Sequence, residues 1–306
     1  MCQKTKFMRY LFLLYIVFNF SCNTEKVLPE NTGSDQEIIL VIDDNLWESE
    51  VGKIIKNSFS KEIKGLPQSE FLFKLIQINN SEFNRFFKTN KNIIFVSDNK
   101  GNTFARNKWA KYQLVFNLSW SGKITEFQDN CERAKDEFYN NEINNILANY
   151  KSTHNISATK FIKSEFDLRI YIPTEYDIPK KENSLFIADF HKFSEKEDLI
   201  KKIIIFEFIP KSFNIQTEII QKTDSILKLY ILGSKEDSYI QIDKRIPIEE
   251  NNGIYRGLWN LKEAYMGGPF LMKVRYKKEK IVISLGIVFA ANQKKRDFIK
   301  IFEAIL

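Results

Sequence analysis

Histidine and cysteine, the side chains most often used in metal and nucleophilic sites, are scarce in this sequence of 306 residues. The histidines are His154 and His191, and the cysteines are Cys2, Cys22 and Cys131. A zinc site usually takes several such ligands, and a nucleophile activated by histidine needs an orienting group beside it. No spacing in the chain suggests either, and there is no phosphate-loop, GxGxxG or GxSxG motif. The sequence therefore predicts no metal site, no cofactor and no catalytic residue of these classes.

Cys22 follows a leader with the parts of a secretory signal. A basic start is followed by a short apolar run over residues 10–20 and by the small residue Ser21. The apolar run is too short to span a membrane stably. A cysteine here resembles the acylation site of bacterial lipoproteins, although Asn19 and Phe20 depart from the usual residues. We expect a signal peptide over residues 1–21 and a lipid on Cys22; the alternative is a plain signal peptide with an incidental cysteine.

The lipoprotein resemblance also implies a location. Asn23 follows the cysteine, where an aspartate retains many such proteins at the inner membrane, so the resemblance implies a lipid anchor in the outer membrane of the cell envelope. Residues 22–36 are interpreted as the lipid-anchored cysteine and a polar tether. Because Cys2 leaves with the leader and Cys22 is acylated, only Cys131 remains and no disulfide can form within the chain. The membrane is thus the first predicted partner.

The charge of the chain argues against a nucleic-acid surface. The formal net charge is +7, but the basic residues outside the leader are interspersed with acidic ones. A nucleic-acid site needs them clustered on one face. A solvated surface of mixed charge is the prediction.

Rare residue types gather in one stretch, in which Gly257, Leu258 and Trp259 are followed by residues 266–270, Met-Gly-Gly-Pro-Phe. Glycine inside a strand pattern usually marks a bulge or a close approach. We expect the backbone to pass close to Trp259 there, with a glycine in a conformation that a Cβ would forbid. The alternative is the floor of a groove for an envelope protein or glycan. Its candidate surface residues are Arg256, Trp259, Tyr265, Met266, Gly267 and Gly268.

Carboxylates can act together without being close in sequence, as in glycosidases. Asp224, Asp243 and Glu263 are such candidates. They leave a hydrolase of envelope glycan or peptide open as the alternative to a non-catalytic binding or structural module. Two carboxylates facing each other in a cleft beside Trp259 would favour the enzyme, and a flat or apolar surface would favour binding.

The elements that must position these residues indicate an α+β fold, with mostly antiparallel sheets and several packed helices. Residues 37–306 form the globular part, with two candidate halves over 37–152 and 160–306. Apolar residues three and four apart predict one long amphipathic helix over residues 123–150, with Cys131 on its buried face. A capping box at Asn45 predicts a helix to Ile63, and strand patterns extend over 166–172 and six further stretches of the second half.

Scattered motifs resemble a family of uncharacterised Bacteroidetes lipoproteins, a domain of unknown function. They include residues 66–68 (Leu-Pro-Gln), 109–113, 255–259 and 266–270, and Lys295-Arg296. The resemblance implies one family-wide domain, lipidation and an envelope location. The family has no established activity, so it implies no functional residue. The predicted function is a non-catalytic envelope lipoprotein, with the hydrolase as the alternative.

Overall fold

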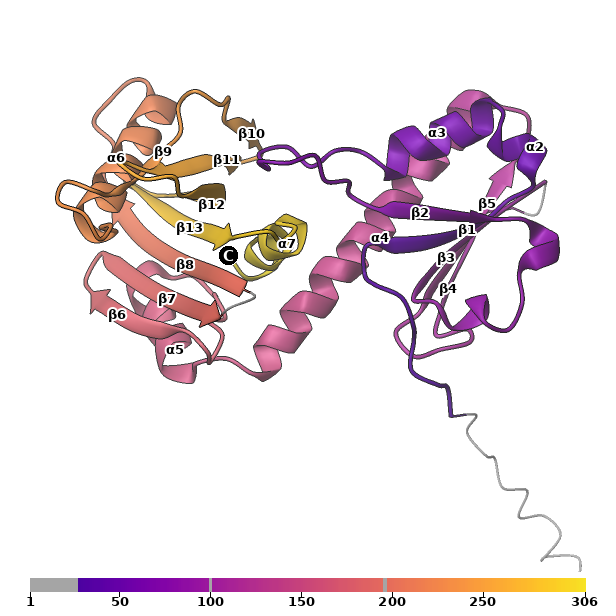
Figure 1. Ribbon diagram of the computed structural model, residues 1–306, viewed down its shortest axis with the longest axis horizontal. Coiled ribbons are helices and arrows are strands. Elements are labelled where there is room, and N and C mark those ends of the chain that lie inside the picture. Colours follow the sequence, from indigo (N-terminus) through magenta and orange to yellow (C-terminus); the bar gives the residue numbers. More distant parts are fainter. Residues whose placement is uncertain (1–26, 99–100, 195–196) are drawn as a thin grey trace, which may run out of the picture.

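The computed structural model describes residues 27–98, 101–194 and 197–306. The predicted signal peptide and Cys22 lie outside these residues. Two β-sheets with their helices lie side by side, and the long helix α4 (Ile124–Ser152) runs between them (Figure 1). The first sheet is built from residues before α4 and the second from residues after it, and we call these parts the first and second halves.

The first half contains a five-stranded sheet in the order β2-β1-β3-β5-β4. Strands β2, β1, β3 and β5 are parallel, and only β4 is antiparallel. Its strands are apolar runs such as Ile38–Ile42, which is buried throughout, and continuous runs are typical of parallel strands covered on both faces. The elements are β1 (Glu37–Val41), α2 (Asp44–Trp47), α3 (Glu50–Phe59), β2 (Lys74–Ile78), short 3₁₀ turns at Asn80–Glu82 and Phe87–Thr89, β3 (Asn92–Asp98), β4 (Thr103–Arg106) and β5 (Leu114–Trp120).

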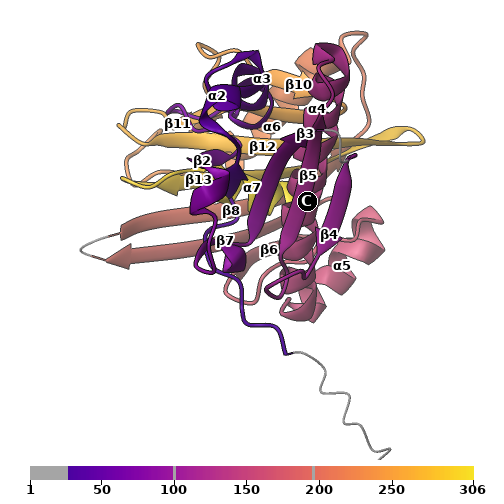
Figure 2. The same ribbon diagram turned by 90° about the vertical axis from the view of Figure 1, so that its right-hand side faces the viewer.

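The second half contains an antiparallel sheet in the order β10-β11-β12-β13-β8-β7-β6, with β9 pairing beside β10 on β11. Helix α6 covers one face of this sheet, and α5 and α7 cover the other (Figures 1 and 2). The elements are α5 (Ile156–Phe166), β6 (Asp177–Glu182), β7 (Leu185–Ser194), β8 (Glu197–Phe208), α6 (Ile215–Tyr230), β9 (Ile240–Ile242), β10 (Glu249–Asn251), β11 (Ile254–Leu261), β12 (Gly267–Lys277), β13 (Lys280–Ala290) and α7 (Arg296–Ile305).

Helix α4 belongs to the cores of both halves. Phe127, Cys131, Ala134 and Phe138 pack into the core of the first half, one face of its amphipathic pattern. Near its other end, Tyr150 packs against the core of the second half. The helix therefore connects the hydrophobic cores of the two halves.

The predicted α+β class, the predominance of antiparallel pairing and the long central helix are confirmed. The first sheet differs because its apolar runs pair in parallel. The strand predicted over residues 166–172 is wrong: Phe166 ends α5, Asp167 has a left-handed backbone conformation, and residues 168–172 belong to none of the described strands. Leu168, Ile170 and Ile172 pack on the core of the second half. Their alternation therefore reflects this packing and not the hydrogen bonds of a β-sheet.

Helix starts also differ from the sequence patterns. The predicted capping box at Asn45 is absent, and Ser49 caps α3 by accepting the Val51 N–H at 3.2 Å. Helix α5 was missed within a polar stretch, where Asn155 caps it by accepting the Ala158 N–H at 3.0 Å. The side chains of Ser and Asn can hydrogen-bond to nearby backbone groups both in turns and at helix N-caps. Which of them begins a helix therefore depends on the side-chain geometry in the folded chain.

Candidate binding site between the two halves

The stretch of rare residues forms a tight crossing inside the second sheet. Trp259 is 3% exposed and lies opposite Gly268 on the neighbouring strand. A Cβ on Gly268 would collide with the carbonyl oxygen of Val288, and one on Gly267 would lie 2.7 Å from that of Trp259. Glycine is thus required by close approach. The special backbone conformation expected for Gly267 or Gly268 is not found, since neither has a positive φ.

The six candidate surface residues do not share one exposed face. Trp259 and Gly268 are buried, Gly267 and Met266 are half-buried, and Tyr265 is fully exposed. Arg256 points to the opposite face of the sheet from Trp259 and pairs with Glu303 of α7 at 3.0 Å. Of the six, Arg256 alone lines the cavity between the two halves that is described below.

Two of the three candidate carboxylates are hydrogen-bonded within local structure. Asp224 accepts the Ile242 N–H at 2.8 Å, and Asp243 forms a two-pronged pair with Arg245. Glu263 is exposed in the turn after β11. The carboxylates Asp224 and Asp243 therefore hold strands and turns in place, and no pair of them faces a cleft beside Trp259.

Histidines and Cys131 form no ligand cluster within the part of the chain that the structure describes. His154 contacts the Lys151 carbonyl at 2.9 Å, and His191 contacts Lys202 at 3.3 Å. Burial raises the pKa of the Cys131 thiol to about 12. A protonated, buried thiol is a packing group and a poor nucleophile.

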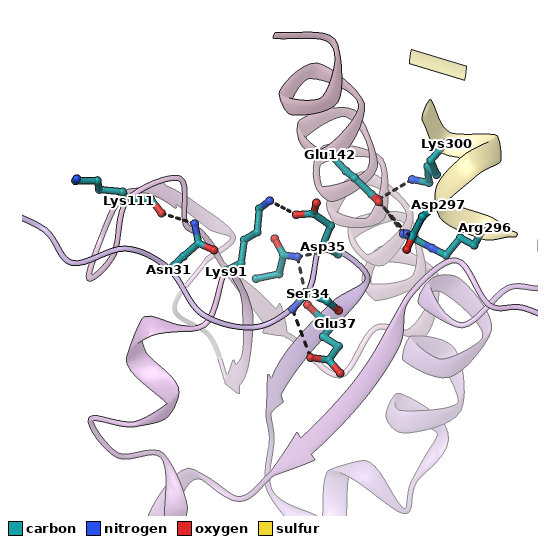
Figure 3. Close-up of polar contacts among 11 residues, drawn as sticks. Asn31, Ser34, Asp35, Glu37, Lys91, Lys111, Glu142, Arg296, Asp297 and Lys300 are labelled. Atoms are coloured by element: carbon teal, nitrogen blue, oxygen red, sulfur yellow. Dashed lines mark hydrogen bonds and ion pairs between the residues drawn. The ribbon is translucent and has the colours of Figure 1, made fainter. Parts of the chain in front are cut away.

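A buried charge cluster joins the two halves where α4 meets α7. Glu142 accepts two hydrogen bonds of 2.9 Å from Arg296 and one of 2.7 Å from Lys300 (Figure 3). The side chains of all three are at most 5% exposed. We call these three residues the junction cluster. Two cations around one carboxylate satisfy most of its lone pairs, the condition under which a buried charge is tolerated.

An arm from the first half, residues 61–72, reaches the second half beside the junction cluster. Glu70 accepts the backbone N–H groups of Lys295 and Arg296, at 2.7 and 3.1 Å, and so caps the start of α7. Leu72 accepts the Arg296 Nε–H through its carbonyl at 2.9 Å. The first half therefore supplies the cap for a helix of the second half.

Gly65 at the tip of the arm touches strand β11. Its φ is +76°, and a Cβ there would lie 2.9 Å from the Arg256 Cβ and from the Gly257 N. Both the backbone angle and the contact require glycine. This contact places the arm over the edge of the second sheet, as Figure 1 shows near β10 and β11.

A cavity of about 390 Å³ lies between the arm, α4, α7 and the edge strand β10. Its size is that of a small-ligand site. The wall carries both charge signs, with the Arg256–Glu303 pair less than one-fifth exposed. The residues that line it are Lys61, Glu62, Ile63, Lys64, Leu72, Tyr139, Glu249, Glu250, Asn251, Arg256, Arg296, Ile299, Lys300 and Glu303.

Burial shifts the pKa values of two residues in the inner wall of this cavity. Burial, opposed by the attraction of Glu142, lowers the pKa of Lys300 to about 8. Burial and the nearby Glu303 carboxylate raise the pKa of Tyr139. The Lys300 Nζ lies 3.5 Å from the centre of the Tyr139 ring, a cation–π contact. Burial thus makes the charged form of Lys300 less favourable than that of an exposed lysine.

A second cavity, of about 440 Å³, meets the junction cluster at Glu142 and Lys300. It is lined partly by residues 31–36, which the sequence assigns to the tether. This segment is bonded to the first half: Asn31 donates to the Lys111 carbonyl at 2.9 Å, Asp35 pairs with Lys91, and Asn92 donates to the Asp35 carbonyl at 3.0 Å. Figure 3 shows these contacts next to the junction cluster. Residues 29–36 are therefore part of the folded body.

Sequence reasoning missed the junction cluster. Helix α7 buries Arg296 and Lys300 together with the apolar residues Ile299, Phe302 and Ile305. The available signal was a pair of cations four residues apart on the same helix face as Ile299. Their partner Glu142 lies more than 150 positions earlier, so spacing alone could not identify it.

Two family models match the chain, and each describes a domain of unknown function. Residues 31–151 match the model described as Domain of unknown function (DUF8532), and residues 155–306 match Domain of unknown function (DUF4837). The predicted resemblance to a domain of unknown function is thus confirmed, but two models cover what we expected to be one domain. Glu142 lies in one matched region and Arg296 in the other.

No curated protein matches the chain. A similar solved structure is described as "Crystal structure of LpqN involved in cell envelope biogenesis of Mycobacterium tuberculosis", with 8% identity over 44% of this chain and 77% of that chain and a TM-score of 0.26. A score this low does not establish a common fold. Among the described helices, none combines the length and apolar character needed to cross a bilayer.

Proposed function

We propose that the protein is an envelope lipoprotein, anchored through Cys22, that binds a short peptide in the cavity between its halves. The observation that carries the binding proposal is that one cavity takes its wall from both halves: the arm and α4 on one side, β10, β11 and α7 on the other. Sites between two units are common places for ligands. The anchor rests on the leader and on Ser21-Cys22.

Two features of the wall favour a peptide over a glycan. Strand β10 is an edge strand of the second sheet, and an extended peptide can pair with an exposed strand edge. A sugar would need a free aromatic face, but the only aromatic ring among the described lining residues is that of Tyr139, which the Lys300 ammonium contacts. The cation Lys64 on the arm and the carboxylate Glu249 on β10 suit the two ends of a peptide.

Hydrolysis, the alternative from the sequence, gains no support from the positions of its candidate residues. Asp224 and Asp243 are bound by neighbouring groups, and Glu263 lies on the surface away from the cavity lining. In the cavity, Glu303 is paired with Arg256. We therefore propose binding without a chemical step.

Site-specific photocrosslinking in cells tests the binding proposal. A photoreactive amino acid replaces Lys64 on the arm or Glu249 on β10, and a matched control replaces Glu279, exposed in the turn between β12 and β13. We expect a peptide adduct, identified by mass spectrometry, at positions 64 and 249 and not at 279. A carbohydrate adduct, or equal yields at all three positions, would contradict the proposal. Fatty-acid labelling of wild type and Cys22→Ser tests the anchor separately.

A further inference from the structure

Exposed apolar side chains gather where the described chain begins. Val27 is 85% exposed, Phe86 75% and Tyr112 65%. Large apolar side chains that are this exposed mark a contact surface when they lie together. They belong to three segments that are far apart in sequence, so their grouping is a property of the fold.

Hydrogen bonds hold these three segments together at one end of the first sheet, where β3 and β5 start. Lys111 donates its N–H to the Pro29 carbonyl at 2.9 Å, and Thr32 donates its N–H to the Thr89 carbonyl at 2.8 Å. Gln113 donates through its side chain to the carbonyls of Lys88 and Asn90, both at 2.6 Å. The segments 27–32, 86–90 and 108–113 therefore form one surface, which we call the anchor-side surface.

Cations surround the apolar side chains on the anchor-side surface. Arg85, Lys108 and Lys111 are exposed, and Lys88 is half-buried. The Lys108 ammonium lies 4.3 Å from the centre of the Trp109 ring, and Lys111 pairs with Glu30 at 2.6 Å. Aromatic rings with neighbouring Lys and Arg are the composition that settles at a membrane interface, where rings enter the headgroup layer and cations meet anionic lipids.

The position of Cys22 identifies what covers this surface. Val27 follows Cys22 by five residues, and a fully extended chain spans at most about 3.6 Å per residue, or about 18 Å. A lipid on Cys22 therefore holds the bilayer within that distance of the anchor-side surface. We infer that the protein rests on the membrane through this surface, with Phe86 and Tyr112 in the headgroup layer. This inference depends on the lipid anchor of the proposed function.

The contact of the anchor-side surface with the bilayer is a second point of membrane attachment, in addition to the lipid on Cys22. Because residues 29–36 are docked on the first half, the lipid anchor and the anchor-side surface meet the membrane at the same end of the body, and the two contacts together set its orientation. The cavity between the halves is then held at a fixed distance above the membrane. In Figure 1 the described chain starts below the first half, and the second half lies beside the first, not between it and the chain start.

A fluorescent probe on the lipidated, full-length protein tests this inference. Tyr112→Cys receives an environment-sensitive label, and Ser121→Cys, exposed just beyond the other end of β5, is the matched control. Cys131 is fully buried and Cys22 is acylated, so the label reports on one position. In phosphatidylethanolamine–phosphatidylglycerol vesicles with nitroxide headgroups, we expect quenching at position 112 and none at 121, and loss of the quenching when Phe86→Asp is added.

The outcomes separate the two proposals. If the protein carries fatty acid and enters vesicles but positions 112 and 121 are equally unquenched, the anchor stands and the membrane-contact inference is overturned. If quenching at 112 survives Phe86→Asp and vesicles without anionic lipid, the stated chemistry of the contact is wrong. If the protein carries no fatty acid, the anchor proposal fails, and the inference that depends on it fails as well.

Discussion

The crossing at Trp259 and the junction cluster at Glu142 are both buried, but different forces hold them. At the crossing, a large ring packs against a strand where a side chain on Gly268 would collide with the backbone. At the junction, one carboxylate and two cations from different halves satisfy one another. Packing of this kind stabilises a fold, whereas buried ion pairs often contribute little net stability and fix geometry instead. The comparison suggests that the junction sets the orientation of the halves.

Removing the ring at the crossing should have the largest effect. Trp259→Ala should lower the free energy of unfolding by about 3–5 kcal/mol, since the ring is buried. Gly268→Val should be at least as harmful because its side chain meets the Val288 carbonyl. Denaturant melts measure both, and an exposed-site change such as Glu279→Ala, expected within about 0.5 kcal/mol, is the control. A small loss for Trp259→Ala would remove the contrast with the junction.

Breaking the junction cluster should be almost as harmful, but it should be reversible by further substitution. Glu142→Leu leaves two buried cations without their carboxylate and should lower stability by about 3 kcal/mol or more. The triple variant Glu142→Leu, Arg296→Met, Lys300→Met removes the charges together and should recover most of that loss in the same melts. If the triple variant is less stable than Glu142→Leu, the charges stabilise the protein and the comparison fails.

The arm contact should have an intermediate effect. Gly65→Ala combines an unfavourable φ with a clash against β11, and should lower stability by about 1–3 kcal/mol. Gly122→Ala is the matched control, because Gly122 has a φ of +80° but no atom within 4 Å of the added Cβ. The difference between their melting midpoints measures the contact of the arm with the second half. Equal losses would show that only the backbone angle matters.

The junction should respond to pH, whereas the crossing should not. The pKa of Lys300 is lowered to about 8 in the folded protein, and that of an unfolded lysine is about 10.4. Between these values the unfolded chain binds more protons, so the folded state gains stability as pH rises. The stability of wild type relative to Lys300→Met should therefore increase from about pH 8 to pH 10. The offset of Trp259→Ala should stay constant, and a falling Lys300 offset would reverse the assignment.

Cys131 should show the smallest effect. Cys131→Ala should lower stability by on the order of 1 kcal/mol, because it removes one buried sulfur. The raised pKa of the thiol keeps it protonated at neutral pH, so thiol reagents should not react with the folded protein. Rapid labelling before unfolding would instead place Cys131 at an accessible position.

Local patterns predicted most of the fold, and long-range contacts decide the site. The long helix was predictable because residues such as Phe127, Cys131 and Phe138 repeat on one face. Strand β4 and helix α5 were missed in polar stretches, since polar residues at edges and caps resemble loops. The parallel pairing of β1 with β2 and β3 could not be read from one strand at a time.

The candidate site was less predictable than the fold. The sequence singled out Trp259 and its glycines by their rarity, and the structure places them in the core. Glu142, Arg296 and Glu70 are ordinary charged residues whose burial arises only when the two halves meet. Of the predicted surface, Arg256 alone lines the cavity, since it points to the α7 face of the sheet.

The central claim is that the junction cluster orients the halves to make one binding cavity. The most direct test combines the triple variant Glu142→Leu, Arg296→Met, Lys300→Met with the photoreactive residue at position 249. We predict that this protein recovers most of the stability lost in Glu142→Leu and loses the peptide adduct at 249. A folded triple variant that keeps the adduct at the wild-type yield would contradict the claim.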